Sequence, residues 1–234
     1  MSIFAALNVY HDLAPRSAAM NMAIDQALLE SAAAPSIRFY RWESPALSFG
    51  YFGRFADVAD TASERDLVRR WTGGGIVFHG EDMTYSVVIP AGDPVFVKSP
   101  MSIYSAIHAS LRNALNATGQ SAELAIIAEV SDRRNKPNVT VPYRRSNNCF
   151  ANPVRADVMI DSRKVAGAAQ RRTRGGLLQQ GSVQYIDLVN GLVERFVQAL
   201  SANCDEREIA DEVLKRGQEL AEQKYKTDAW LRRR

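Results

Sequence analysis

The chain has 234 residues, of which 46% are hydrophobic and 24% charged, and its formal net charge is +3. This composition is ordinary for a globular protein, and we expect a single domain over residues 1–234. It argues against a dedicated nucleic-acid binder, which would be more basic, and against a membrane protein, because no apolar run approaches the ~20 residues needed to cross a bilayer.

The N-terminal segment and the cysteines bear on the cellular compartment. MSIFAALNVYHDLAPR contains a short apolar stretch, but no basic region precedes it and no clear cleavage site follows, so we predict a first strand there rather than a signal peptide. Cys149 and Cys204 are too few for a disulfide scaffold, and no CxxC or Cys/His cluster indicates zinc. We therefore expect a cytoplasmic protein without a metal site.

The first half of the chain alternates helical and strand patterns. Residues 17–33 predict an amphipathic helix, in which the apolar positions are Met20, Ile24, Ala27 and Leu28. Runs that alternate apolar and polar residues predict strands at 37–42, 46–49, 76–79 and 83–89. Ser99 followed by Pro100 is typical of a helix start, and a stripe at four-residue spacing follows at Ile103, Ile107, Leu111 and Leu115.

The second half begins with a polar, arginine-rich segment, 131–146, that predicts an exposed loop. Strands are expected at 157–160, 164–170 and 177–185, with a tight turn at Asp161-Ser162. A helix over 187–200 would bury Leu188, Leu192, Val193, Phe196 and Leu200. A last helix is expected near Asp205, because Asp205 and Glu208 resemble a capping box. Together these elements predict an α+β fold in which helices cover a mainly antiparallel or mixed sheet.

The stretch Arg69-Arg70-Trp71-Thr72-Gly73-Gly74-Gly75-Ile76-Val77-Phe78-His79 is the first candidate for a functional site. Three glycines between two predicted strands let the backbone approach a ligand closely, with N–H groups free to bind it. Arg70 and His79 add a permanent cation and a titratable donor. The glycines alone leave open a plain hairpin with a solvated arginine pair. A Walker A motif is excluded, because no Gly-Lys-Ser/Thr follows.

A second candidate stretch runs from Asn147 to Ser182. It contains Cys149-Phe150, then Lys164 in the run DSRKVAGAAQRR, and then LLQQGS. Taken singly, a cysteine is most often a small buried hydrophobe, and a lysine in a strand is usually exposed. Their occurrence together with the glycine loop favours a reactive site.

These two stretches resemble the biotin/lipoate protein ligase superfamily. VRRWTGGGIVFHGEDMTYS is similar to its RRxTGG-x-x-VxH signature, and KVAGAAQ is similar to its lysine motif. The CF pair, a lysine 15 residues after the cysteine, AQRR and LLQ-x-GS resemble the LipM-type octanoyltransferases, over about residues 20–230. The resemblance implies the catalytic-domain fold of the superfamily.

Two positions depart from these patterns, in opposite directions. Gly75 stands where many such transferases have arginine, which resembles the ligases. Arg155-Ala156-Asp157 lacks the Arg-Asn-Asp common in ligases. Cys149 decides for the transferase, because ligases need no nucleophilic thiol.

The resemblance implies octanoyl-acyl carrier protein as donor and a lipoyl-domain protein, such as the glycine cleavage H protein, as acceptor. Cys149 would carry the octanoyl group as a thioester, and the ammonium of Lys164 would favour its thiolate. This cycle works best if the pKa of Lys164 lies below its usual ~10.4. No cofactor is expected, because transfer from thioester to amide is downhill without ATP.

The expected binding residues form two walls of an acyl pocket. Arg70, Thr72, Gly73, Gly74 and Gly75 would line one wall, with Gly167, Ala168 and Ala169 opposite. His79 would shape the pocket or donate a hydrogen bond, and we do not expect it to act as a general base. Basic residues that either steer acidic carrier proteins or are merely solvated are Arg133, Arg134, Arg144, Arg145, Arg171, Arg172 and Arg174.

Three alternatives remain open. An ATP-dependent lipoate–protein ligase would hold an acyl adenylate in the same pocket, with Lys164 on its oxygens. An amidotransferase that moves octanoate between lipoyl proteins would use the same cysteine. A non-catalytic acyl- or adenylate-binding protein is disfavoured by the presence of both Cys149 and Lys164.

Overall fold

The computed structural model describes residues 2–126, 150, 152–188 and 191–233. Cys149 and the loop predicted at 131–146 lie outside these residues. The described strands form an eight-stranded sheet, β11-β1-β2-β6-β10-β9-β8-β7, and a three-stranded sheet, β4-β3-β5. The large sheet consists of β1 (Leu7–Arg16), β2 (Ser36–Trp42), β6 (Met83–Pro90), β7 (Ala122–Leu124), β8 (Val158–Ile160), β9 (Arg163–Arg172), β10 (Gly176–Val183) and β11 (Cys204–Glu206).

The large sheet is mixed, as predicted. β1 runs parallel to β2 and β11, and the pairs from β2 across to β7 are antiparallel. The predicted turn at Asp161-Ser162 joins β8 to β9, and both residues have positive φ, 49° and 61°. A two-residue turn of this left-handed kind matches the twist of a β-hairpin. The register places Gly181 of β10 opposite Ala168 of β9 and Tyr85 of β6.

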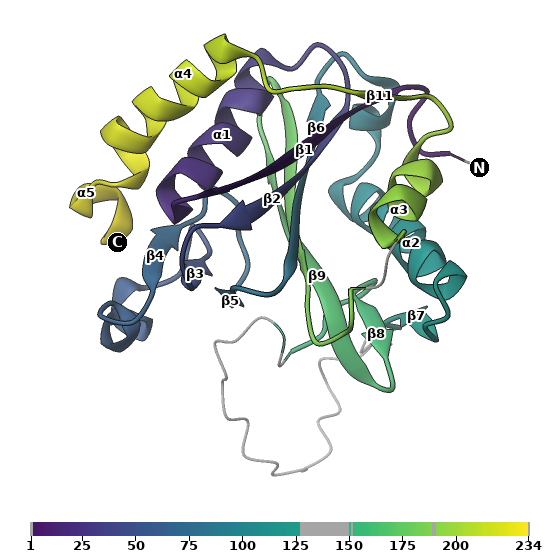
Figure 1. The fold of residues 1–234 in the computed structure, drawn as a ribbon, viewed down its shortest axis with the longest axis horizontal. Helices are drawn as coiled ribbons and strands as arrows, with labels where there is room; N and C mark the ends of the chain where they lie inside the picture. Colours follow the sequence, from purple (N-terminus) through teal and green to yellow (C-terminus); the bar gives the residue numbers. More distant parts are fainter. Residues whose placement is uncertain (1, 127–149, 151, 189–190, 234) are drawn as a thin grey trace, which may run out of the picture.

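Helices cover both faces of the large sheet (Figure 1). They are α1 (Ala18–Ser31) and α4 (Asp211–Leu220) on one face, and α2 (Pro100–Ala117) and α3 (Leu192–Leu200) on the other. Strand β6 shows why both faces must be covered. Val87 and Ile89 belong to the core under α2 and α3, whereas Val88 packs with α1. Successive residues of a strand point to opposite faces, so an apolar run buries both.

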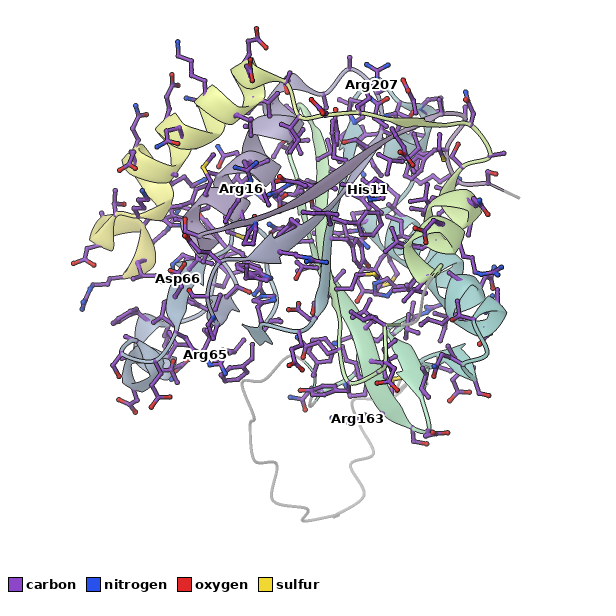
Figure 2. The ribbon with its side chains drawn as sticks, in the orientation of Figure 1. His11, Arg16, Arg65, Asp66, Arg163 and Arg207 are labelled. Carbon is purple, nitrogen blue, oxygen red and sulfur yellow. The ribbon has the colours of Figure 1, made fainter. Side chains whose placement is uncertain are left out.

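The three-stranded sheet lies beside α1 and consists of β3 (Ala46–Phe49), β4 (Asp66–Arg69) and β5 (Ile76–His79). Asp66, labelled in Figure 2, accepts a hydrogen bond of 2.7 Å from the Ala18 N–H at the start of α1. Arg69 is 1% exposed, and its guanidinium donates to the carbonyls of Tyr51, Gly53, Trp230, Leu231 and Arg233. These contacts tie the small sheet to the helix and to the C-terminal segment.

The remaining described elements are short. They are the 3-10 turns Phe55–Asp57, Ala59–Thr61 and Pro94–Val97, the π-helical turn Ala221–Tyr225 (η4), and α5 (Asp228–Leu231). No helix of the described residues is both long and apolar enough to cross a membrane.

Most predicted elements are confirmed, including the start of α2. The Ser99 hydroxyl accepts from the Ser102 N–H at 3.1 Å, and the predicted stripe, Ile103, Ile107, Leu111 and Leu115, is fully buried. Because cap and stripe depend on residues within a few turns, the sequence contains the whole signal.

Two predictions at the C-terminal end are wrong. Cys204–Glu206 is not a helix start but the edge strand β11, which pairs with β1, and α4 begins only at Asp211. All three β11 side chains are exposed, so no apolar alternation marked the strand. Helix α3 begins at Leu192, and Leu188, expected on its buried face, is 43% exposed.

Candidate functional site

The two stretches singled out from the sequence meet at one cavity. It lies where the small sheet, α1, and the strands β2, β6, β9 and β10 converge. Its lining includes the predicted residues Arg70, His79, Gly167, Ala168 and Ala169. The other lining residues are Met22, Tyr40, Trp42, Ser48, Val77, Thr84, Phe150, Gln180, Gly181 and Ser182.

On the side of the small sheet, the cavity is bordered by a continuous chain of polar contacts. The Arg70 guanidinium donates to Ser48 Oγ at 2.6 Å, and Ser48 Oγ lies 2.6 Å from His79 Nε2. His79 Nδ1 lies 2.8 Å from Asp82 Oδ2. The imidazole is also stacked on the Trp42 ring, with centroids 4.1 Å apart. Ser48 belongs to β3 and His79 to β5, so the two paired strands hold the central pair of this chain.

The Asp82 carboxylate is buried, with a 3% exposed side chain, and protein groups supply its hydrogen bonds. Besides His79, it accepts from the hydroxyls of Thr84 and Ser182, both at 2.7 Å, and from the Gly80 N–H at 3.0 Å. Burial alone would raise the pKa of Asp82. The interaction with His79 and these hydrogen bonds outweigh burial, so the pKa of Asp82 lies below its usual value.

The predicted lysine lies next to two residues that line the opposite side of the cavity. Lys164 is 4% exposed, and its Nζ lies 2.8 Å from Asp157 Oδ2. The Lys164 side chain crosses Gly167 so closely that a Cβ there would lie 2.4 Å from its Cε and 2.6 Å from its Nζ. Its ammonium also lies 5.4 Å from the centroid of the Phe150 ring. Gly167 and Phe150 line the cavity, but Lys164 itself does not, so its contact with a bound acyl group stays a prediction.

Asp157 is itself held from α2. Tyr104 donates to Asp157 Oδ1 at 2.5 Å, and the Ala168 N–H donates to the Tyr104 hydroxyl at 3.1 Å. Burial, and then the negative charge of Asp157, raise the pKa of Tyr104 above its usual value. His108 packs on Tyr104, and its Nδ1 lies 2.7 Å from the Ala156 carbonyl. Burial lowers the pKa of His108 to about 4, so this imidazole is neutral at pH 7.

A third buried network supports the floor of the cavity. Asp25 of α1 accepts from Arg38 Nη1 at 2.8 Å and from Gln180 Nε2 at 2.7 Å. Gln180 in turn accepts from the Thr72 hydroxyl at 2.8 Å. Thr72, predicted to bind substrate, is therefore fully buried behind Gln180, which faces the cavity.

The family model of the lipoyl protein ligase A/B catalytic domain matches residues 17–222, which include the whole cavity lining. The chain belongs to this family. Octanoyltransferase LipM of Bacillus cereus is 38% identical over 175 residues, which cover 71% of this chain and 61% of that protein. The aligned part of the chain thus spans less than two thirds of that relative's length.

Solved structures share the fold of this chain. A lipoate-protein ligase A bound with ATP has a TM-score of 0.74 at 22% identity, and the match covers 96% of this chain and 97% of that one. A bipartite lipoate protein ligase of Thermoplasma acidophilum, from a structural study of the ligase and its E2 lipoyl domain, has a TM-score of 0.71 at 19% identity, covering 97% and 96%. The predicted α+β fold of a ligase-type catalytic domain is therefore confirmed.

The glycine loop of this family member differs from the expected wall. Gly73 is absent from the cavity lining, and Gly74 and Gly75 border a second hollow beside Phe52 and Gly53. The cause is Arg70, whose Nη2 donates to the Gly73 and Gly75 carbonyls at 3.1 and 2.8 Å. These carbonyls turn inward to bind a buried cation. A substrate-binding role for the three glycines stays a prediction.

Beside the cavity lining, Trp71 begins a cluster of cations and aromatic rings. Lys224 lies over the rings of Trp71 and Trp230, at 4.6 and 4.2 Å, and Arg171 lies over Trp71 at 5.2 Å. Burial, and then the charge of Arg171, lower the pKa of Lys224 to about 8. Arg172 instead donates to the carbonyls of Phe96 and Lys98, so its charge is tied to the protein. Arg133, Arg134, Arg144 and Arg145 lie outside the described residues.

Sequence reasoning missed three groups of the site: Ser48, Asp82 and Tyr104. The segments that contain Ser48 and Tyr104 were predicted only to form a strand and a helix. Asp82 was noted only as one residue at the end of the first motif. A signal existed for Asp82, which follows His79 at three residues, a spacing at which a turn lets two side chains meet. Within the described ranges, no cluster of three or more His, Cys, Asp or Glu side chains could hold a metal ion.

Proposed function

We propose that this protein is an octanoyltransferase that takes an octanoyl group from octanoyl-acyl carrier protein onto Cys149 and passes it to a lysine of a lipoyl-domain protein, such as the glycine cleavage H protein. The main support is the convergence of both motifs on one cavity. Arg70 and His79 from the first stretch, and Phe150 and Gly167 from the second, line it together.

The relatives support the same reaction. The name of the Bacillus cereus relative, octanoyltransferase LipM, supports octanoyl transfer as the activity. The Thermoplasma acidophilum work, which pairs a ligase of this fold with an E2 lipoyl domain, supports a lipoyl domain as acceptor.

The first half-reaction loads the enzyme. A cysteine with an ordinary pKa of ~8.5 is only a few per cent thiolate at neutral pH, and a nearby cation raises that fraction. Lys164 supplies the cation, and the Asp157 carboxylate, 2.8 Å away, compensates its charge inside the protein. The Cys149 thiolate attacks the carbonyl carbon, the bond to the carrier sulfur breaks, and Lys164 gives its proton to the departing thiolate.

The second half-reaction unloads it. The acceptor lysine amine attacks the Cys149 thioester, and the neutral Lys164 takes the amine proton, which restores the ammonium. The Cys149 thiolate leaves as the amide forms. Conversion of a thioester to an amide is downhill, so the proposed cycle uses neither ATP nor another cofactor.

The apolar part of the cavity suits an acyl chain. Met22, Val77 and the small side chains of Ala168 and Ala169 line it. Burial of an alkyl chain there contributes ~0.8 kcal/mol per methylene, which favours an extended fatty acyl group over a short polar one. We further propose a single catalytic domain, since the family match runs from 17 to 222, and a cytosolic location, in keeping with the low cysteine content.

Intact-protein mass spectrometry after incubation with octanoyl-acyl carrier protein tests the proposal. We expect one octanoyl adduct on the wild-type chain and on Cys204→Ala, whose thiol lies on the exposed strand β11, and none on Cys149→Ala. Retention of full transfer by Cys149→Ala would refute the covalent route.

The same assay separates the alternatives. Lipoylation from lipoate plus ATP, without any adduct from the carrier protein, would identify a ligase. Loading from octanoyl-H protein but not from octanoyl-carrier protein would identify an amidotransferase. Binding of acyl compounds without transfer to any acceptor would identify a binding protein.

A further inference from the structure

The polar chain beside the cavity selects one tautomer of a neutral His79. The pKa of the Asp82 carboxyl lies below its usual value, so Asp82 Oδ2 accepts a hydrogen bond and His79 Nδ1, 2.8 Å away, carries a proton. In the neutral imidazole Nε2 then has no proton, and it accepts from the Ser48 hydroxyl at 2.6 Å. The Arg70 guanidinium, which can only donate, donates to Ser48 Oγ at 2.6 Å.

This assignment is the one that activates a serine. A hydroxyl faces the unprotonated nitrogen of an imidazole, and a buried carboxylate orients that imidazole through its other nitrogen. Both contacts are within the range expected of a nucleophile, its base and the group that orients the base. Ser48 and His79 both line the cavity, as does Arg70, whose charge lies next to Ser48 Oγ.

The neighbouring groups keep this arrangement in place. Ser48 lies on β3, paired with Val77 of β5, so its backbone is rigid. The Trp42 ring stacks on His79, and Asp82 has three further donors besides the imidazole. A site on paired strands with such support is held more accurately than one on a loop.

We propose that Ser48 is a second acyl-accepting nucleophile, with His79 as its base, and that the cavity hydrolyses medium-chain acyl esters and thioesters to free fatty acids. The inference rests on the proposed function in one respect only, namely that a fatty acyl chain occupies this cavity. It needs water as the co-reactant and does not involve Cys149.

The reaction balances as follows. Ser48 Oγ attacks the acyl carbonyl carbon and its proton passes to His79 Nε2, while the Arg70 guanidinium stabilises the negative charge that develops on oxygen. The bond to the leaving thiol or alcohol breaks, and His79 returns the proton to it. Water then attacks the Ser48 ester by the same route in reverse, which releases the carboxylic acid and regenerates the hydroxyl.

An octyl fluorophosphonate tests the nucleophile directly, because a serine oxygen activated in this way attacks phosphorus and displaces fluoride. We expect one adduct on the wild-type protein, which tandem mass spectrometry places on Ser48 and not on the nearby Ser44. The labelling rate should fall by ~100-fold in His79→Asn, the usual loss of a general base. Ser110→Ala, a buried serine on α2 outside the cavity, should label at the wild-type rate. No adduct, or an adduct elsewhere, would overturn the proposal.

Hydrolysis of p-nitrophenyl octanoate gives an independent readout. Cys149→Ala should still hydrolyse the ester, and adding Ser48→Ala should reduce the rate by ~100-fold. An equal rate in both would mean that the chain only orients Arg70 and the glycine loop, and the proposal would be wrong. The label is applied to the wild-type protein, so a poorly folded Ser48→Ala variant does not remove the test.

The two proposals fail separately. If octanoyl-carrier protein leaves no adduct at Cys149 while Ser48 is labelled, octanoyl transfer is refuted and the hydrolytic site stands. If Cys149 is loaded while the fluorophosphonate leaves Ser48 unmodified, only the hydrolytic site is refuted.

Discussion

Asp157 and Asp82 are two buried carboxylates, one paired with Lys164 and the other with His79, and the protein compensates their charges differently. Asp157 is paired with the ammonium of Lys164, so two full charges of opposite sign are buried together. Asp82 faces an imidazole that donates one hydrogen bond, two hydroxyls and a backbone N–H.

The difference separates two kinds of site. In the ion pair, the Lys164 ammonium carries a proton that it can give up and regain, as the proposed octanoyl transfer requires. A carboxylate surrounded by neutral donors instead fixes one tautomer of an imidazole, as a general base requires. The two arrangements also differ in what the loss of one partner costs, and that difference can be measured.

Asp157→Asn should produce the largest effect. It leaves the Lys164 ammonium buried without its compensating charge, and loss of one partner of such a pair costs about 3–5 kcal/mol of unfolding free energy. Urea unfolding measures it. As a control, Asp157→Leu combined with Lys164→Met removes both charges and should cost less than the single change. A single change no worse than the double would show that the pair is not effectively buried.

Acid should lower the free energy of unfolding by favouring protonation of His108, which packs on Tyr104. The pKa of His108 is about 4 in the folded protein, against ~6.5 when unfolded, so between these values the unfolded chain binds more protons. Stability should therefore fall as pH drops from about 6.5 to 4, by about 3 kcal/mol in total. Urea unfolding of the wild type and of His108→Gln across this range measures it. Equal pH slopes in the two proteins would contradict the prediction.

Asp82→Asn should cost less, about 1.5–3 kcal/mol, because it weakens hydrogen bonds to a charged group without exposing an unpaired charge. The new amide can present either an oxygen or an NH2 group to His79, so it no longer fixes the imidazole tautomer, and fluorophosphonate labelling of Ser48 should slow. Ser182→Ala, which removes one of the donors to Asp82, serves as the matched smaller change, with about 1 kcal/mol expected. If Asp82→Asn leaves both stability and labelling unchanged, the comparison of the two carboxylates fails.

Gly167→Ala should affect transfer more than stability. The new Cβ would lie 2.4 Å from Lys164 Cε, and the flexible lysine end can move away, which displaces its Nζ from the present position beside Gly167. Octanoyl transfer should slow by at least about tenfold, because small misplacements of a reacting group are costly. Gly92→Ala, whose Cβ would meet nothing within 4 Å, is the control and should keep the wild-type rate.

The sequence predicted those parts of the fold that depend on neighbouring residues. Ser99-Pro100 begins α2, and Asp161-Ser162 turns the chain between β8 and β9, because each signal lies within a few residues. β11 escaped prediction because a pairing with β1, almost 200 residues away, forms it.

The residues of the candidate site also fall into those that neighbouring sequence marks and those that only distant contacts define. Arg70, His79 and Gly167–Ala169 could be found because their motifs are contiguous, and the structure brings them together at one cavity. The partners that orient them could not. Ser48 lies 31 residues from His79, and Tyr104 lies 53 residues from Asp157. Only folding reveals which serine or tyrosine, among many, completes each contact.

Arg69 ties the wall of the cavity to the end of the chain. Its buried guanidinium is satisfied by the carbonyls of Trp230, Leu231 and Arg233, while Arg70, the next residue, binds Ser48 and the glycine loop. During synthesis, therefore, the partners of Arg69 are incomplete until residue 233 has emerged from the ribosome, although Arg69 itself emerges 164 residues earlier.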